Sequence, residues 1–267
     1  MIRMIATDLD GTLLNSKKEM PAELPAVVRA LRERGIPFVP VSGRSYPNLA
    51  DTFRHCPEIE DFICLNGNLV MHQGRVVGHS QFTTEELRRI VADLRREGFT
   101  AITLNAIHTC YYDVKDAAVR AQIDKFFTDV AAVDRLEDVI DTIGPVCKIS
   151  SIDPKGVEEH SFPTLGYLGD DFYLANAGDN WFDIMPKGHD KGVAMGMLAN
   201  AFDIEPEEIM IFGDFLNDLP MMKLKADTWC MKNGHPDVKK ISAHVTEWTN
   251  EENGVIRTIQ NVLDIKI

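Results

Sequence analysis

The feature that most constrains this chain is the repeated succession of a short apolar run and a polar, partly acidic turn. Residues 1–7 are mostly apolar and lead into Asp8-Leu9-Asp10-Gly11-Thr12, and residues 36–41 are apolar and lead into Ser42-Gly43-Arg44. Residues 21–34, between the two runs, carry apolar side chains at helical spacing and stop at Gly35. Strands joined through a helix are typical of a parallel sheet covered by helices, so the sequence predicts an α/β fold with a Rossmann-like core.

The same succession occurs twice more along the chain. Residues 61–65 lead into Asn66-Gly67, and residues 208–212 lead into Gly213-Asp214, shortly before Asn217 and Asp218. Ligands bind beyond the carboxyl ends of parallel strands, so these turns are expected to meet in one site.

A different pattern fills the middle of the chain. Thr83 and Glu86 have the spacing of a capping box. The sequence after them alternates between strand-like and helical runs, and its strand-like runs do not end in acidic turns. We therefore predict a core made of residues 1–80 and 186–267, interrupted by an inserted α+β domain at residues 81–185.

The chemistry of the polar turns indicates a metal and an anionic ligand. The four carboxylates of Asp8, Asp10, Asp214 and Asp218 repel one another unless a cation lies between them, and Mg²⁺ prefers oxygen ligands. Ser42 and Gly43 offer a hydroxyl and backbone N–H groups that suit a phosphate oxygen. Lys191 begins a predicted helix, where the helix dipole disfavours a cation unless an anion is near, and Lys187 is the rival candidate.

In this order, the segments resemble the haloacid dehalogenase-like (HAD) hydrolases. Asp8-Leu9-Asp10-Gly11-Thr12 is similar to the first motif of the family, and Ser42-Gly43-Arg44 to the second. Lys191 is similar to the third motif, and the segment from Gly213-Asp214 to Asn217-Asp218 is similar to the fourth.

The spacing of these motifs resembles one subgroup, the Cof-type phosphatases. Only 31 residues separate Asp10 from Ser42, whereas 142 separate Arg44 from Lys187 and can hold an α/β cap domain. The chain departs from the family at two positions. Phe215 stands where glycine is frequent, which bears on substrate choice, and Gly234 stands where alanine is frequent.

The resemblance implies a mechanism and a set of roles. Asp8 is the expected nucleophile, forming an aspartyl-phosphate, and Asp10 the expected general acid and base. The expected Mg²⁺ ligands are Asp8, Asp214 and the Asp10 backbone carbonyl, with Asp218 in support.

The other motif residues are expected to contact the substrate. Ser42, Gly43, Lys191 and Asn217 would bind the phosphate, and Arg44 and Asn66 would face the substrate or the cap. The expected substrate is a small phosphorylated metabolite such as a sugar phosphate.

The composition limits the classes of partner that the protein is expected to bind. The formal charge of −13, from 28 basic and 41 acidic residues, argues against binding to nucleic acid or to an anionic membrane surface. The five cysteines lack a C-x-x-C pair, and we find no signal-like or membrane-spanning run, so a cytoplasmic enzyme is expected.

Two alternatives share the same residues. One is a phosphomutase, which passes the phosphoryl group of the aspartate to a sugar. The other is a non-enzymatic switch phosphorylated on Asp8, although an acid/base at Asp10 would shorten the lifetime of such a phosphoaspartate.

Overall fold

The chain folds into two compact units. The computed structural model describes residues 1–99, 101–178 and 180–267. The first unit comprises residues 1–44, 52–78 and 189–267, and the second comprises residues 45–51 and 79–188. Most of helix α2 (Tyr46–Thr52) is thus grouped with the second unit.

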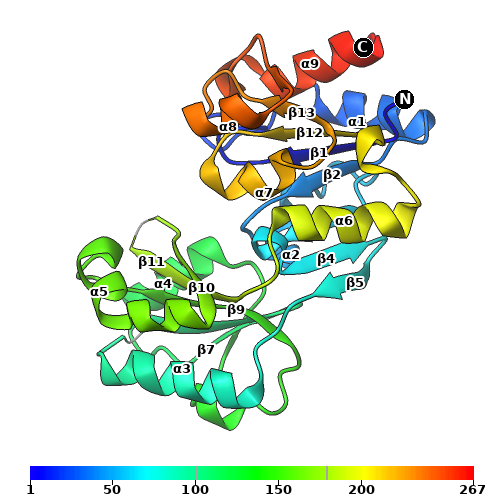
Figure 1. Cartoon of the computed structure of the whole chain (residues 1–267). Coiled ribbons are helices and arrows are strands. Elements are labelled where there is room, and N and C mark those ends of the chain that lie inside the picture. Colours follow the sequence, from blue (N-terminus) through cyan, green and yellow to red (C-terminus); the bar gives the residue numbers. More distant parts are fainter. Residues whose placement is uncertain (100, 179) are drawn as a thin grey trace. The chain divides into compact units, whose positions relative to one another are not determined.

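A largely parallel sheet forms the centre of the first unit. Its strands lie in the order β14-β13-β12-β1-β2-β3-β4-β5, and Figure 1 shows β13, β12, β1 and β2 side by side. Their bounds are β1 (Met4–Asp8), β2 (Phe38–Val41), β3 (Asp61–Cys64), β4 (Leu69–His72), β5 (Arg75–His79), β12 (Ile209–Gly213), β13 (Asp227–Cys230) and β14 (His244–Val245). The predicted α/β class is confirmed, and β3 pairs with β4 in the antiparallel direction.

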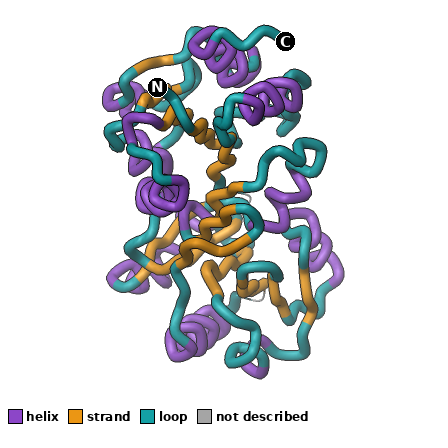
Figure 2. Tube along the Cα trace, turned by 90° about the vertical axis from the view of Figure 1, so that its right-hand side faces the viewer, coloured by secondary structure: helices purple, strands orange, loops and turns teal. Residues whose placement is uncertain are grey.

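Helices flank this sheet, as Figure 2 shows near the two chain ends. They are α1 (Leu24–Glu33), α6 (Lys191–Phe202), α7 (Leu219–Met222), α8 (Pro236–Ile241) and α9 (Gly254–Leu263). Met195 and Leu198 of α6 join Ala6 of β1 and Ile211 of β12 in one buried cluster. Successive side chains of a strand point to opposite faces, so this cluster covers one face of the sheet.

The second unit has a mixed six-stranded sheet, in the order β10-β11-β9-β6-β7-β8. Its strands are β6 (Ala101–Ala106), β7 (Cys110–Tyr112), β8 (Val130–Ala132), β9 (Val146–Ile152), β10 (Phe172–Asn176) and β11 (Trp181–Pro186). Its helices are α3 (Thr84–Arg96), α4 (Ala117–Phe126) and α5 (Phe162–Leu165). The capping box predicted at Thr83 and Glu86 is present at the start of α3.

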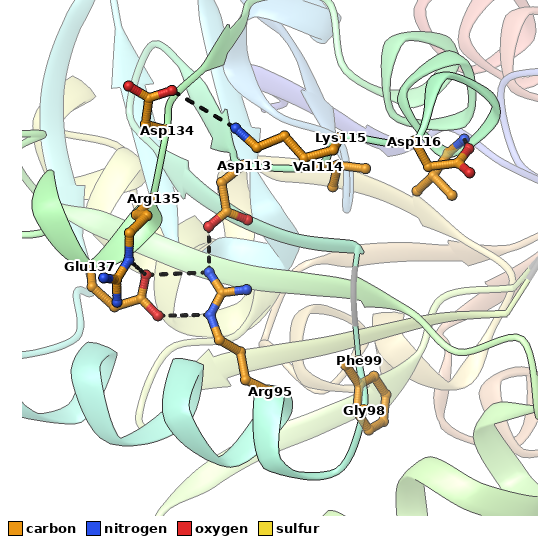
Figure 3. Close-up of a pocket in the computed structure, with 11 residues that line it drawn as sticks. Arg95, Gly98, Phe99, Asp113, Val114, Lys115, Asp116, Asp134, Arg135 and Glu137 are labelled. Atoms are coloured by element: carbon orange, nitrogen blue, oxygen red, sulfur yellow. Dashed lines mark hydrogen bonds and ion pairs between the residues drawn. The ribbon is translucent and has the colours of Figure 1, made fainter.

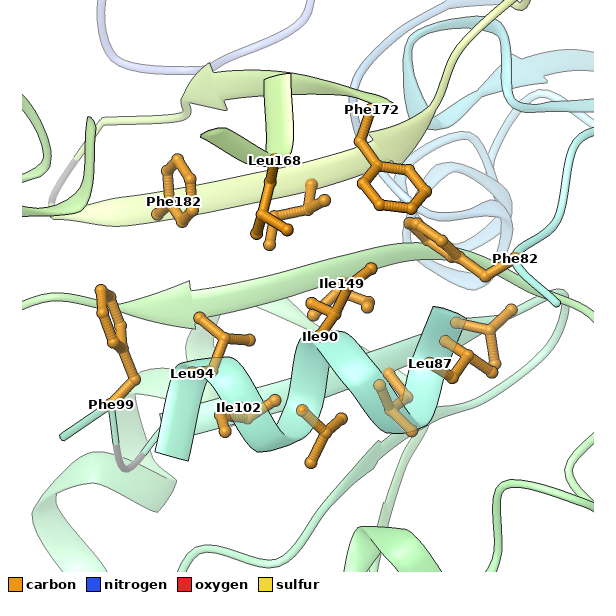
Figure 4. Close-up of a cluster of buried hydrophobic side chains, with 14 of the residues drawn as sticks. Phe82, Leu87, Ile90, Leu94, Phe99, Ile102, Ile149, Leu168, Phe172 and Phe182 are labelled. Atoms are coloured by element: carbon orange, nitrogen blue, oxygen red, sulfur yellow. The ribbon is translucent and has the colours of Figure 1, made fainter. Parts of the chain in front are cut away.

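Helix α3 supplies much of the core of this unit. Leu87, Ile90 and Leu94 recur at helical spacing and point toward the strands in Figure 4, where they meet Ile149 and Phe182. Each such side chain contributes roughly 1.5–3 kcal/mol through burial.

Among the described residues, no helix is both long enough and apolar enough to cross a membrane.

Candidate active site

The first unit gathers the predicted turns at one edge of its sheet. Asp8 ends β1, Ser42 follows β2, Asn66 follows β3 and Asp214 follows β12. These four strands are neighbours in the order β12-β1-β2-β3 and run parallel. Their carboxyl ends therefore open at the same edge, which is why residues up to about 200 positions apart meet there.

A buried lysine links two of the carboxylates. Lys191 is the first residue of α6, and its Nζ lies 2.5 Å from Oδ1 of Asp8 and 2.6 Å from Oδ1 of Asp218. All three side chains are buried. The rival, Lys187, donates instead to the backbone oxygens of Gly169 and Asp170 within the second unit.

Asp218 also fixes the turn that carries Asp214. Its Oδ2 accepts hydrogen bonds from the backbone N–H groups of Asp214, at 2.8 Å, and Phe215, at 3.1 Å. A Cβ on Gly213 would lie 2.9 Å from this carboxylate, so the chain needs glycine there to close the turn.

Thr12 holds the carboxylate of Asp214. Its hydroxyl donates to Oδ1 of Asp214 at 2.6 Å. Gly11 has φ +85°, and a Cβ there would lie 2.5 Å from Oδ2 of Asp214. Sequence analysis placed Thr12 in the first motif without giving it a role.

The resulting cluster carries an excess of negative charge. Oxygens of Asp8, Asp214 and Asp218 lie within 4.8 Å of one another, and one ammonium, that of Lys191, faces them. Three carboxylates against one ammonium leave a formal charge of −2. Oxygen donors with that excess fit a hard divalent cation.

The pKa values of the cluster follow from burial. Burial raises the pKa of Asp8 to about 8, against the attraction of Lys191. Burial likewise raises the pKa of Asp214 to about 6, although the Thr12 hydrogen bond lowers it. Burial alone would lower the pKa of Lys191, but the Asp218 and Asp8 carboxylates outweigh it and hold that pKa above its ordinary value.

Asp10 has different partners from the other three carboxylates. Its Oδ1 accepts from Nζ of Lys18 at 2.7 Å and from Arg44 at 3.1 Å. Burial raises the pKa of Asp10, but these two cations outweigh burial and hold it below its ordinary value. Sequence analysis did not single out Lys18, which has a φ of 64° that a lysine rarely adopts.

The remaining motif residues form a second small group. Ser42 is buried, and its hydroxyl accepts from the Arg44 N–H at 3.3 Å. A Cβ on Gly43 would lie 3.1 Å from the side chain of Asn66, whose Oδ1 accepts from Asn217 at 3.5 Å. The structure thus brings Gly43, Asn66 and Asn217 close together.

A pocket of about 800 Å³ lies elsewhere, in the second unit (Figure 3). Arg95 lines it and is paired with Asp113 and with Glu137. None of the predicted site residues lines this pocket.

Comparisons with known proteins agree with the geometry of the first unit. The family model for haloacid dehalogenase-like hydrolases matches residues 5–259. The chain is 26% identical to the 5-amino-6-(5-phospho-D-ribitylamino)uracil phosphatase YbjI of Escherichia coli, over 98% of this chain and 96% of that protein. It is 25% identical to phosphatase YwpJ of Bacillus subtilis, over 98% of this chain and all of that protein.

Solved structures share the whole fold. TM0651 from Thermotoga maritima matches with a TM-score of 0.86 at 24% identity, over 100% of this chain and 98% of that chain. A haloacid dehalogenase-like hydrolase from Bacteroides thetaiotaomicron matches with a TM-score of 0.83 at 23% identity, over 98% and 100%. The family predicted from the four motifs is therefore confirmed, including its Cof-type grouping: the chain belongs to the haloacid dehalogenase-like hydrolases.

Proposed function

We propose that this hydrolase is a Mg²⁺-dependent phosphatase that releases phosphate from a small phosphorylated metabolite through an aspartyl-phosphate on Asp8. The observation that carries the proposal is the cluster of Asp8, Asp214 and Asp218 around the buried Lys191. The names of the relatives YbjI and YwpJ, both phosphatases, support the same reaction.

The donor set fits Mg²⁺ by chemistry and charge. We assign the metal to Asp8, Asp214 and the Asp10 backbone carbonyl, with Asp218 in support because it fixes both Lys191 and the turn of Asp214. When bound, Mg²⁺ supplies positive charge that lets an anionic nucleophile approach an anionic phosphate.

Asp8 is the nucleophile in this scheme. Lys191 holds its Oδ1, which fixes the orientation of the carboxylate at the end of β1. One carboxylate oxygen attacks phosphorus in line, the new oxygen–phosphorus bond forms, and the bond from phosphorus to the leaving oxygen breaks. Water then attacks the phosphorus of the aspartyl-phosphate and frees both Asp8 and inorganic phosphate.

Asp10 moves the protons of both steps. It protonates the leaving oxygen first and then accepts a proton from the attacking water. Lys18 and Arg44 keep Asp10 ionised in the free enzyme, because they hold its pKa low. An incoming phosphate adds negative charge nearby, and this raises the pKa of Asp10 toward the protonated form that an acid needs.

The phosphate oxygens are bound by groups from separate elements. We assign this role to Ser42, the Gly43 N–H, Lys191 and Asn217, while Arg44 and Asn66 face the substrate or the cap. Preorganised donors of this kind act on charge that develops in the transition state.

The second unit is proposed to act as the cap domain, with the insert at residues 81–185 supplying the substrate contacts and excluding water during transfer. We further propose a cytoplasmic location, which the five buried cysteines, none of them in a disulfide, support.

A phosphate-release screen over phosphorylated metabolites tests the function. We expect release with Mg²⁺, loss of release with EDTA, and loss with Asp8→Asn although the variant stays folded. Asp141→Asn, an exposed aspartate paired with Arg88 in the second unit, is the matched control and should match wild type. Isomerisation of a sugar phosphate that requires an added sugar bisphosphate, without net release of phosphate, would favour the phosphomutase. A lasting phosphoryl group on Asp8 without turnover of any ester would favour the switch.

A further inference from the structure

An aromatic side chain stands exposed beside the catalytic cluster. Phe215 follows Asp214 directly and is 54% exposed, the largest exposed fraction of any Phe, Tyr or Trp that the structure describes. Leu216, the next residue, is also exposed. Single exposed apolar residues are common, so exposure alone does not indicate a role.

The backbone of Phe215 is held on both sides. Its N–H donates to Oδ2 of the buried Asp218 at 3.1 Å, and its carbonyl oxygen accepts from the Asp218 N–H at 2.9 Å. The same carboxylate binds Lys191. The position of Phe215 is therefore coupled to that of the catalytic cluster.

The ring of Phe215 is held as well. It packs edge-to-face against the ring of His235, with centroids 5.6 Å apart and an interplanar angle of 87°. The His235 N–H donates to the carbonyl oxygen of Asp214 at 2.7 Å, and its Nδ1 accepts from the Asp237 N–H at 3.2 Å. An exposed ring mounted in this way loses little conformational entropy when a ligand covers it.

We propose that Phe215 determines substrate preference, favouring phosphate monoesters whose leaving group carries a planar aromatic or heteroaromatic ring. The inference rests on the proposed phosphatase function. In the proposed mechanism Asp10 protonates the leaving oxygen, and Gly11, the residue after Asp10, lies against the carboxylate of Asp214, one residue before Phe215. A phenyl ring offers stacking and apolar contact to a flat group, but it cannot satisfy the hydroxyl groups of a polyol as hydrogen-bonding side chains do.

The test compares two esters, pyridoxal phosphate and glycerol phosphate, with Mg²⁺ present. The measured quantity is the ratio of kcat/KM for the aromatic ester to that for glycerol phosphate. We expect Phe215→Leu to lower this ratio about tenfold, mainly through the KM of pyridoxal phosphate, because stacking is lost. Phe215→Tyr, which keeps a ring, should restore the ratio.

Two further variants separate an effect on substrate preference from an effect on folding. Val262→Ala removes an apolar side chain of similar exposure from α9 and should leave both kcat/KM values unchanged. Phe215→Met replaces the leucine variant if that variant fails to fold, since it also lacks a ring.

Two outcomes would overturn the inference while leaving the phosphatase function in place. One is an unchanged ratio in the ringless variants, which includes an equal loss on both esters. The other is a wild-type enzyme that hydrolyses glycerol phosphate but not pyridoxal phosphate. A wild-type enzyme that releases phosphate from no ester would refute the proposed function, and this inference with it.

Discussion

Removing the buried ammonium of Lys191 is expected to destabilise the protein in a pH-dependent way. Lys191→Met keeps most of the apolar stem but leaves the carboxylates of Asp8 and Asp218 without the cation that lies 2.5 and 2.6 Å from them. Removing one partner of a buried ion pair costs about 3–5 kcal/mol, because the remaining charge stays buried. For a chain of this length, that cost lowers Tm by about 10 °C.

The pH dependence of this loss has a definite sign. Burial raises the pKa of Asp8 to about 8, and the loss of Lys191 raises it further. Near pH 5 Asp8 is therefore protonated in both proteins, and only the pairing with Asp218 is lost. The difference in Tm should be smaller near pH 5 and grow as the pH rises through 8, where wild-type Asp8 ionises beside Lys191.

Thermal unfolding followed by circular dichroism in EDTA measures this difference. Lys187→Met is the matched control, because the Nζ of Lys187 donates to backbone carbonyls, those of Gly169 and Asp170, at 2.6 and 2.8 Å. We expect it to cost about 1 kcal/mol, with no dependence on pH in this range. A Lys191→Met protein that melts within about 2 °C of wild type at every pH would refute the reasoning.

Three further predictions follow from the site. Burial raises the pKa of Asp8 to about 8 and of Asp214 to about 6, so protons compete with Mg²⁺ for these carboxylates. Titration calorimetry should show that the affinity for Mg²⁺ rises from pH 5 to 8 and that binding releases protons. A constant affinity for Mg²⁺ would contradict this prediction. Gly11→Ala should lower the free energy of unfolding by at least about 1 kcal/mol more than Gly35→Ala in urea, because both glycines have positive φ but only Gly11 meets Asp214; equal losses would exclude the clash. Lys18→Met should raise the pKa of Asp10 and shift the corresponding limb of the pH–rate profile to higher pH. An unchanged profile would show that Lys18 does not influence proton transfer by Asp10.

The sequence was sufficient to place the main elements of the site. Aspartates at strand ends and a lysine at a helix start can be identified in the sequence. They were expected to meet because adjacent parallel strands open at one edge of a sheet. The structure accordingly brings Asp8, Asp214, Asp218 and Lys191 together. Their chemical roles remain predictions.

Other contacts were not predictable from the sequence. Lys18 reaches Asp10 through a turn with positive φ, which no residue-type pattern indicates for a lysine. Thr12 meets Asp214 across more than 200 positions. The residue pattern favours a helix from Ala117 to about Val130, yet α4 ends at Phe126. Residues 130–132 pair with β7 as a strand, because tertiary pairing overrides local propensity.

Single-turnover labelling tests the central claim most directly. Wild-type protein and Asp8→Asn would be mixed with a phosphate ester labelled in its phosphoryl group, in the presence of Mg²⁺, and quenched in acid before the cycle ends. The account predicts label covalently bound to the wild-type peptide that contains Asp8, and none on the variant. Phosphate release at the wild-type rate by Asp8→Asn, or release by wild type without label on that peptide at any quench time, would contradict it.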